Sequence, residues 1–300
     1  MRVLMVSDVY FPRVNGVSTS METFRLKLVG EGVETRLVVP RYGDEPDEPG
    51  IIRVAGRSVP GDPEDRIVRW RAMHRAVAEA AADCDLIHVQ TPFVAHYAGL
   101  AAARKIGLPV LATYHTLFEE YLQHYAPCLP ASWLRRAARS FSRRQCNALD
   151  GIIVPSSAMR ERLEQYGVKT PLHVLPTGIP VSRFGSGDGA AFRKAHGIPA
   201  TRPVALYVGR VAHEKNIGFL IEAVRVAIAG VPDLLLLITG EGPATAELNS
   251  ASIVPSASLA ILIVSASCLA ATARPISSCL LRAPKPRVWF CSKPWRQVCP

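Results

Sequence analysis

The sequence predicts an α/β protein with one complete Rossmann-like domain and the beginning of a second one. Three observations support this fold class. Short β-branched runs alternate with longer amphipathic segments through residues 1–180, the same alternation restarts after a break rich in glycine and proline, and it stops after Pro243. Strands that alternate with helices favour a parallel sheet with helices on both faces.

Six short apolar runs are the predicted strands of the first domain, residues 1–180. They are Val3–Val6, Thr35–Val39, Leu86–Val89, Val110–Thr113, Gly151–Val154 and Leu172–Leu175. Helical spacing of apolar residues predicts helices between them. One carries Val17, Met21, Phe24 and Leu28 on one face, and others run from about Pro63 to Ala82 and from Phe93 to Lys105.

A linker over residues 181–200 separates the two predicted domains, because glycines and prolines interrupt all periodicity there. A second βαβ pattern then starts over residues 201–243. It comprises a strand Pro203–Val208, a helix Lys215–Ala229 and a strand Leu234–Thr239. A domain of this kind needs roughly another hundred residues to be complete.

Residues 244–300 differ in character from the rest and are expected to form no part of this fold. They contain no glycine, one acidic residue (Glu247) and four of the seven cysteines. The uncharged stretch Leu248–Ala273 has the length of a membrane span, but Pro255 and several serines argue against one.

Composition excludes several classes of protein. Half of the net charge of +10 lies in residues 244–300, so the charge gives little support to nucleic-acid binding. The cysteines have no paired or metal-ligand spacing, and the apolar run at the N-terminus is too short for a signal peptide. These features predict a protein of the cytoplasm.

Two candidate binding segments lie in the first domain. Asn15-Gly16-Val17-Ser18 opens the first predicted helix, where backbone N–H groups suit a phosphate; a bare turn is the alternative. Residues 114–125 follow a strand end, where open α/β sheets bind ligands, and they contain His115, Glu119, Glu120 and Tyr121. A purely structural role for these polar residues is the competing interpretation.

A third candidate, residues 209–216, leaves the first strand of the second domain. Arg210 and Lys215 could neutralise a diphosphate, although a solvated helix start would show the same pattern. The glycines of residues 185–189 look like part of a dinucleotide fingerprint, but no strand precedes them. A nicotinamide oxidoreductase is therefore not favoured.

Taken together, these segments resemble family 4 glycosyltransferases of the two-domain GT-B fold. The resemblance is carried by NGVS (15–18), DLIHVQTPF (85–93), YHT (114–116), VPSSAMRERL (154–163), VLPTGI (174–179), GRVAHEKN (209–216) and ITGEGP (238–243). The segment YHTLFEEYLQHY (114–125) is most similar to bacterial members that glucosylate diacylglycerol.

The resemblance implies a retaining transferase that moves a sugar from a UDP-glucose-like donor to a hydroxyl acceptor, without a metal or other cofactor. Gly16, Arg210 and Lys215 would bind the donor diphosphate, His115 would contact the donor sugar, and Glu119, Glu120 and Tyr121 would lie on the acceptor side. The acceptor would be a lipid such as diacylglycerol, or a glycan.

A basic segment between residues 133 and 144 matches the place where such enzymes dock on an anionic membrane at the inner face of the cell. Its candidate contact residues are Trp133, Arg135, Arg136, Arg139, Arg143 and Arg144. A solvated helix face is the alternative. A non-catalytic protein that binds a membrane or a partner through this segment is the competing functional hypothesis.

The chain departs from the family pattern in two places. Pro180 stands where the family usually has Asp, and the pair of glutamates, separated by seven residues, that holds the sugar and ribose is missing. Permitted codons for Arg282–Pro300, shifted by one nucleotide, can encode such a pair in the string SRTETQGLVLLEAMAAGVP. We therefore expect residues 244–300 to be an out-of-frame translation and the printed chain to be inactive.

Overall fold

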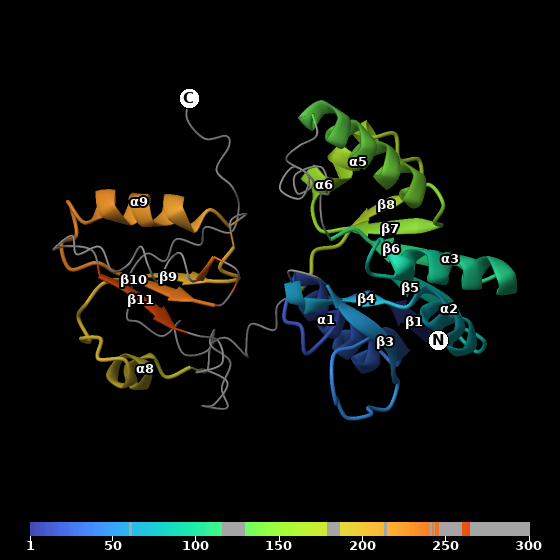
Figure 1. The fold of residues 1–300 in the computed structure, drawn as a ribbon, viewed down its shortest axis with the longest axis horizontal. Helices are drawn as coiled ribbons and strands as arrows, with labels where there is room; N and C mark the ends of the chain where they lie inside the picture. The colour runs from blue at the N-terminus through green and yellow to red at the C-terminus, as the bar shows by residue number, and fades with distance from the viewer. Residues whose placement is uncertain are drawn as a thin grey trace. The chain divides into compact units, whose positions relative to one another are not determined.

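The structure is a computed structural model that describes residues 1–59, 62–115, 130–178, 187–212, 215–240, 242, 244–245 and 260–264. The chain divides into two compact units, Met1–Ile179 and Pro180–Pro300 (Figure 1). Each unit is built on its own sheet.

The first unit contains an eight-stranded sheet in the order β4-β3-β2-β1-β5-β6-β7-β8. All neighbouring strands are parallel except β3 and β4, which are antiparallel. The strands are β1 (Arg2–Val6), β2 (Glu34–Arg41), β3 (Ile51–Val59), β4 (Asp62–Val68), β5 (Leu86–Val89), β6 (Val110–Thr113), β7 (Gly151–Val154) and β8 (Leu172–Val174).

The central strand β1 sends alternate side chains into two hydrophobic cores, one on each face of the sheet. Val3 and Met5 belong to the core that α1 covers, while Leu4 and Val6 belong to the core on the opposite face. Successive side chains of a strand point to opposite faces, so an uninterrupted apolar run is the pattern that a strand buried on both sides requires.

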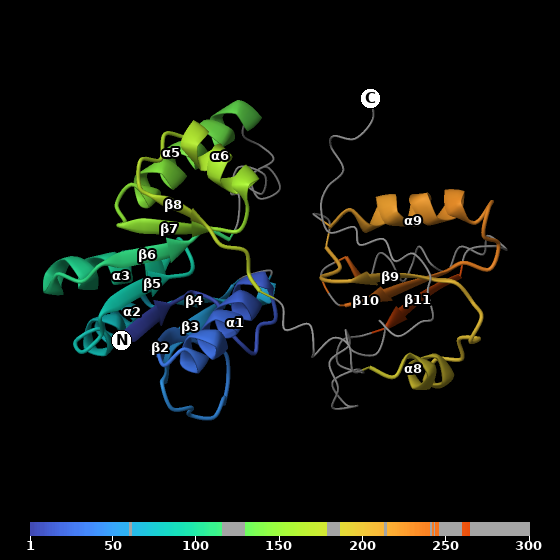
Figure 2. The same cartoon turned by 180° about the vertical axis from the view of Figure 1, so that it is seen from behind.

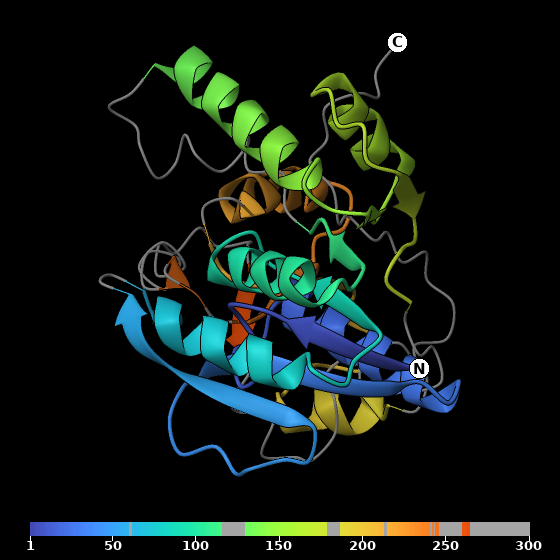
Figure 3. The same cartoon turned by 90° about the vertical axis from the view of Figure 1, so that its right-hand side faces the viewer.

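Five helices of the first unit are described: α1 (Gly16–Gly30), α2 (Trp70–Ala80), α3 (Val94–Ile106), α5 (Ala131–Cys146) and α6 (Ser157–Gln165). Helices α2 and α3 lie side by side on one face of the sheet, and α1 covers the other face (Figures 2 and 3). The predicted parallel sheet with helices on both faces is thus confirmed.

The helix predicted from Pro63 to Ala82 is wrong over its first half. Residues 62–68 form the edge strand β4, which pairs with β3 through Arg57 and Ile67, and the helix α2 begins only at Trp70. Strand β3 was not predicted at all. The acidic and basic residues of β4 fit a helix as well as a strand. The pairing of β3 with β4 therefore decides the outcome.

The second unit contains a three-stranded parallel sheet in the order β11-β10-β9. Its strands are β9 (Val204–Val208), β10 (Leu235–Thr239) and β11 (Ala260–Val264), and its helices are α8 (Gly189–Ala195) and α9 (Ile217–Ala227). The two helices lie on opposite faces of the sheet (Figure 1). Helix α9 buries Ile217, Ile221 and Val224 against β10.

Two expectations for this unit need correction. Helix α8 occupies part of the predicted linker, where Asp188 caps it by accepting hydrogen bonds from the N–H groups of Ala190 and Ala191. Strand β11 lies in residues 244–300, where no element was expected, and Ala260 pairs with Leu235. Five consecutive apolar residues suit a strand beside the buried β10, and this local preference decides the outcome.

Candidate active site

Three polar loops meet at one edge of the first sheet, because they follow the carboxyl ends of neighbouring strands. Residues 7–15 follow β1, residues 90–93 follow β5, and residues 114–115 follow β6. The strand order places β1, β5 and β6 next to one another. Open α/β sheets bind ligands at this edge.

Gly16 stands at the start of α1, directly after its capping residue. The Oδ1 atom of Asn15 accepts a hydrogen bond from the N–H of Ser18 at 2.8 Å, and no acidic residue occupies the first helical turn. A Cβ atom at Gly16 would meet no other atom within 4 Å, so the backbone here is open. This helix start has the free N–H groups and the positive end of the dipole that suit an anion.

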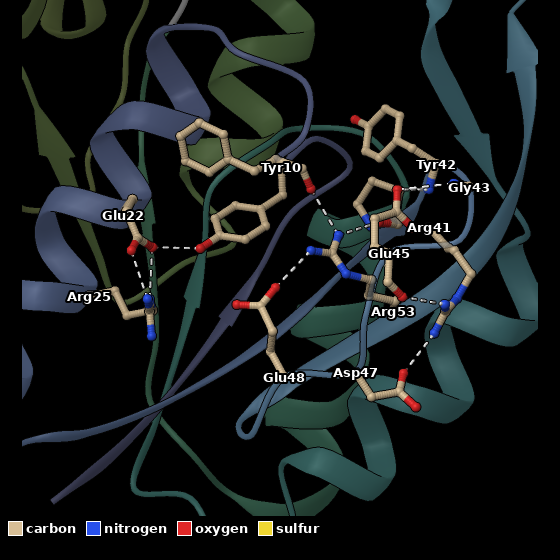
Figure 4. A network of polar contacts seen from close by, with 12 residues as sticks. Tyr10, Glu22, Arg25, Arg41, Tyr42, Gly43, Glu45, Asp47, Glu48 and Arg53 are labelled. Atoms are coloured by element: carbon tan, nitrogen blue, oxygen red, sulfur yellow. Dashed lines mark hydrogen bonds and ion pairs between the residues drawn. The ribbon is translucent and has the colours of Figure 1, made fainter. Parts of the chain in front are cut away.

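The loop that leads into α1 is held by a polar network (Figure 4). Tyr10 donates a hydrogen bond to Glu22 at 2.6 Å, and Glu22 forms an ion pair with Arg25. Arg53 reaches from β3 and donates to the carbonyl oxygen of Phe11 at 2.8 Å. Burial and the neighbouring Glu22 raise the pKa of Tyr10, so the phenol keeps its proton and its bond to the carboxylate.

The same network closes the loop after β2. The N–H groups of Tyr42 and Gly43 donate to Glu45 at 2.9 and 3.0 Å, and Arg41 pairs with Asp47 (Figure 4). Both loops at this end of the sheet are therefore fixed by hydrogen bonds between residues close in space.

His115 lies directly after β6, and Gln90 lies directly after β5. The distance between His115 Nε2 and Gln90 Oε1 is 3.0 Å. Burial lowers the pKa of His115 to about 4. The imidazole is therefore neutral near pH 7, and it can hydrogen-bond a ligand but contributes no positive charge.

Asp8 joins the first two of these loops. Its carboxylate accepts hydrogen bonds from the Thr91 hydroxyl at 2.7 Å and from the N–H of Ala95 at 3.1 Å. Asp8 thus caps α3 from a distant part of the chain. Phe93, which occupies the N-cap position itself, makes no side-chain hydrogen bond there. Burial raises the pKa of Asp8 to about 6 in spite of these hydrogen bonds.

Helix α5 presents the predicted basic surface. Trp133 is 72% exposed, and Arg135, Arg136, Arg143 and Arg144 are exposed as well. Arg139 differs from these because its guanidinium lies over the ring of Tyr166, 5.5 Å from the ring centroid. Arg139 therefore takes part in packing between α5 and α6.

The buried side of α5 is tied to the loops at the sheet edge. Gln145 donates to the carbonyl oxygen of Pro92 at 2.6 Å, and the hydroxyls of Ser142 and Tyr114 are 2.9 Å apart. The basic helix is thus anchored beside the loops that carry Gln90 and His115.

In the second unit, the loops after β9 and β10 approach each other so closely that only glycine fits. A Cβ atom at Gly240 would lie 1.9 Å from the carbonyl oxygen of Gly209, and one at Gly242 would lie 2.1 Å from that of Val211. Arg210 and Lys215 belong to the loop after β9, and Lys215 is exposed. The close contact between the two loops fixes the backbone of the loop that carries Arg210 and Lys215.

Glu119, Glu120 and Tyr121 lie outside the described residues, so the structure places none of these predicted acceptor-side residues. Gln90, Asp8 and Thr91 were missed by the sequence prediction, although all three follow strands. Position after a strand could have pointed to them; their partners, 25 to 87 residues away, could not be identified from the sequence.

Among the described residues, no group of three or more His, Cys, Asp or Glu side chains could hold a metal ion. Likewise, no helix in the part of the chain that the structure describes is both long and apolar enough to cross a membrane.

Comparison with known proteins agrees with this geometry. A profile described as "Glycosyltransferase Family 4" matches residues 14–183, and one described as "Glycosyl transferases group 1" matches residues 188–252. The second match extends beyond Pro243, where the family pattern was expected to stop.

Named relatives include a synthase and a mannosyltransferase. The alpha-monoglucosyldiacylglycerol synthase of Streptococcus pneumoniae is 33% identical over 268 residues, which covers 83% of this chain and 58% of the relative. A GDP-mannose-dependent alpha-mannosyltransferase of Mycobacterium tuberculosis is 29% identical over 83% of this chain and 65% of the relative. The chain thus spans less than two thirds of either relative.

Solved structures share the fold. Sucrose-phosphate synthase from Thermosynechococcus elongatus superposes with a TM-score of 0.64 at 19% identity, over 88% of this chain and 70% of that one. Anabaena Alr3699/HepE in complex with UDP-glucose superposes with a TM-score of 0.63 at 14% identity, over 93% and 72%.

The fold and its polar strand ends therefore define a GT-B type α/β protein. The chain belongs to glycosyltransferase family 4.

Proposed function

We propose that this protein derives from a retaining transferase that moves a hexosyl group from a UDP-glucose-like donor to the hydroxyl of a membrane lipid such as diacylglycerol. The observation that carries the proposal is the anion-suited start of α1, at the same carboxyl edge of the parallel sheet as the neutral His115. The pneumococcal relative, named as a diacylglycerol glucoside synthase, supports the lipid acceptor.

In this proposal the charges of the donor are met by backbone and side chains. The N–H groups near Gly16 bind a donor phosphate, and Arg210 and Lys215 neutralise the departing diphosphate. Electrostatic stabilisation of the leaving group is the main demand of such a transfer. The acceptor hydroxyl attacks on the face that the nucleotide leaves, a donor phosphate takes its proton, and no metal takes part.

We further propose that the printed chain itself transfers no sugar. No Asp or Glu follows Glu247, so residues 248–300 supply no carboxylate for the sugar or the ribose. A shift of reading frame accounts for this, and sequencing the gene tests it. DNA in which no frame encodes two glutamates separated by seven residues would refute the frame shift.

Titration calorimetry tests donor binding. The chain restored to the family frame should bind UDP-glucose more tightly than GDP-mannose, and the printed chain should bind both much more weakly. Arg210→Ala should weaken binding about tenfold, because it removes a charge-assisted hydrogen bond. Arg225→Ala, on the exposed face of α9, is the matched control. If the frame-restored chain binds UDP-glucose equally well with and without Arg210→Ala, the assignment of Arg210 to the diphosphate is wrong.

The lipid acceptor predicts that α5 docks on an anionic membrane. Each arginine near such a surface contributes about 1 kcal/mol. Co-sedimentation with vesicles of phosphatidylglycerol should therefore fail when four exposed arginines of α5 become glutamine: Arg135, Arg136, Arg143 and Arg144.

The control removes the same charge elsewhere by changing four other exposed arginines to glutamine: Arg57, Arg69, Arg71 and Arg75. Net charge alone would weaken both variants equally, and that result would rule out a specific role for α5. If the unmodified chain binds neither vesicles of phosphatidylglycerol nor vesicles of phosphatidylcholine, membrane docking is ruled out altogether.

A further inference from the structure

Gln90 combines deep burial with an unsatisfied amide. The residue is 1% exposed, its Oε1 atom lies 3.0 Å from His115 Nε2, and its Nε2 atom has no hydrogen-bond partner among the residues that the structure describes. Leaving a buried donor unpaired costs about 1–3 kcal/mol, so an apolar residue of similar size would be easier to accommodate here. Because the unpaired amide nitrogen of Gln90 is costly, its presence points to a role for the amide oxygen, Oε1.

The bond to Gln90 determines which nitrogen of His115 carries the proton. A carbonyl oxygen only accepts, so His115 Nε2 must be the N–H donor. Because burial keeps the ring neutral, Nδ1 then bears a lone pair. Nδ1 makes no hydrogen bond to any residue in the described part of the chain.

The neighbouring His88 shows the contrast. Its Nε2 atom lies 2.8 Å from the hydroxyl of Thr113, and a hydroxyl can donate or accept. That bond leaves the tautomer of His88 open, whereas the amide oxygen of Gln90 fixes the tautomer of His115. The two histidines are thus an internal comparison within one site.

We propose that Gln90 is a positioning residue that fixes His115 as its Nε2–H tautomer, so that Nδ1 accepts a hydrogen bond from one hydroxyl of the donor sugar. This inference rests on the proposed function for its ligand. It assigns a chemical selectivity, because an accepting nitrogen requires a group that can donate. A hydroxyl satisfies it, whereas hydrogen or fluorine at the same carbon does not.

Nitrogen NMR of the ¹⁵N-histidine-labelled full chain tests the tautomer without any ligand. We expect the single Nε2–H form of His115 in the wild type. In Gln90→Leu both tautomers should become populated, while the signals of His88 stay unchanged. An Nδ1–H form in the wild type, or one fixed tautomer in Gln90→Leu, would overturn the proposal.

Calorimetry with UDP-glucose analogues then tests the selectivity in the frame-restored protein. One deoxy analogue and its fluoro counterpart should each bind about tenfold more weakly than UDP-glucose. In Gln90→Leu this difference should shrink to about twofold or less. Tolerance of every fluoro analogue would mean that His115 donates, which refutes the proposal.

Failure of the proposed function gives a different result. If no UDP-sugar binds even the frame-restored wild type, the donor assignment is wrong, whereas the NMR result on the tautomer stands by itself. The two hypotheses can therefore fail separately.

Discussion

The buried carboxyl of Asp8 should lower the stability of this protein at neutral pH, relative to an uncharged side chain at the same position. Its pKa rises from 3.8 to about 6 in the folded state, since burial outweighs the hydrogen bonds from Thr91 and Ala95. A carboxyl whose folded pKa is raised contributes stability that is present below pH 3.8 and is lost as the pH rises to about 6. At 1.36 kcal/mol per pH unit, the loss is about 3 kcal/mol.

Asp8→Asn should recover much of that stability at pH 7, because a neutral amide of the same shape can still accept from Ala95. The gain should approach 3 kcal/mol at pH 7 and vanish near pH 4, which corresponds to a Tm difference of roughly 6–12 °C for a unit of this size. Urea unfolding or differential scanning calorimetry of both proteins at several pH values measures it.

The comparison has to be made between variants, because histidines titrate in the same range. Burial lowers the pKa of His88, His96 and His115 to about 4, so their contribution is lost as the pH falls from 6.5 to 4. Subtracting the wild-type curve cancels this opposite trend. Asp150 also accepts from a backbone N–H but is exposed, so Asp150→Asn is the control and should bring no gain at pH 7. A gain from Asp8→Asn that is equal at pH 4 and pH 7 would refute the reasoning.

Three further substitutions test the packing. Gly240→Ala should destabilise the second unit by about 3 kcal/mol or more, because its Cβ would lie 1.9 Å from a carbonyl oxygen. Gly218→Ala, where a Cβ meets no other atom within 4 Å, should instead stabilise the unit by up to about 1 kcal/mol. Hydrogen exchange of the backbone amides of β9 and β10 measures both effects. Asn15→Ala removes the cap of α1 and should cost about 1 kcal/mol in urea unfolding; no loss would show that the cap is dispensable. Leu4→Ala in the core should cost about 2–5 kcal/mol, while Leu26→Ala, at an exposed position, should stay within about 0.5 kcal/mol in the same assay; similar losses would contradict the assigned burial.

The buried parallel strands could be predicted from the sequence because their apolar runs are local signals. Leu86–Val89, Val110–Thr113 and Gly151–Val154 begin and end where the structure has them. The hairpin of β3 and β4 could not be predicted, since its charged edge strand resembles a helix and only the pairing decides. Charged residues on an edge strand also discourage pairing with other chains.

The candidate site was predictable only in part, for a related reason. The place of His115 follows from its position after a strand, which is local information. Its partner Gln90 lies 25 residues away, and Asp8 caps a helix 87 residues further along the chain. Capping normally leaves a sequence signature at the helix start, but here Phe93 occupies that position and the capping side chain comes from another loop. Contacts of this kind depend on the strand order, which no local pattern encodes.

Strand β11 shows that pairing in a sheet says little about function. Strand β10 is buried throughout, and a parallel neighbour satisfies its backbone N–H and C=O groups. The five apolar residues Ala260–Val264 can fill that place through shape and backbone alone. Transfer of a sugar depends instead on the side chains that follow a strand, and no Asp or Glu stands anywhere in residues 265–300. The frame-restored chain should therefore keep a strand beside β10 and gain the two carboxylates; if it bound UDP-glucose no better than the printed chain, the missing glutamates could not account for the inactivity we propose.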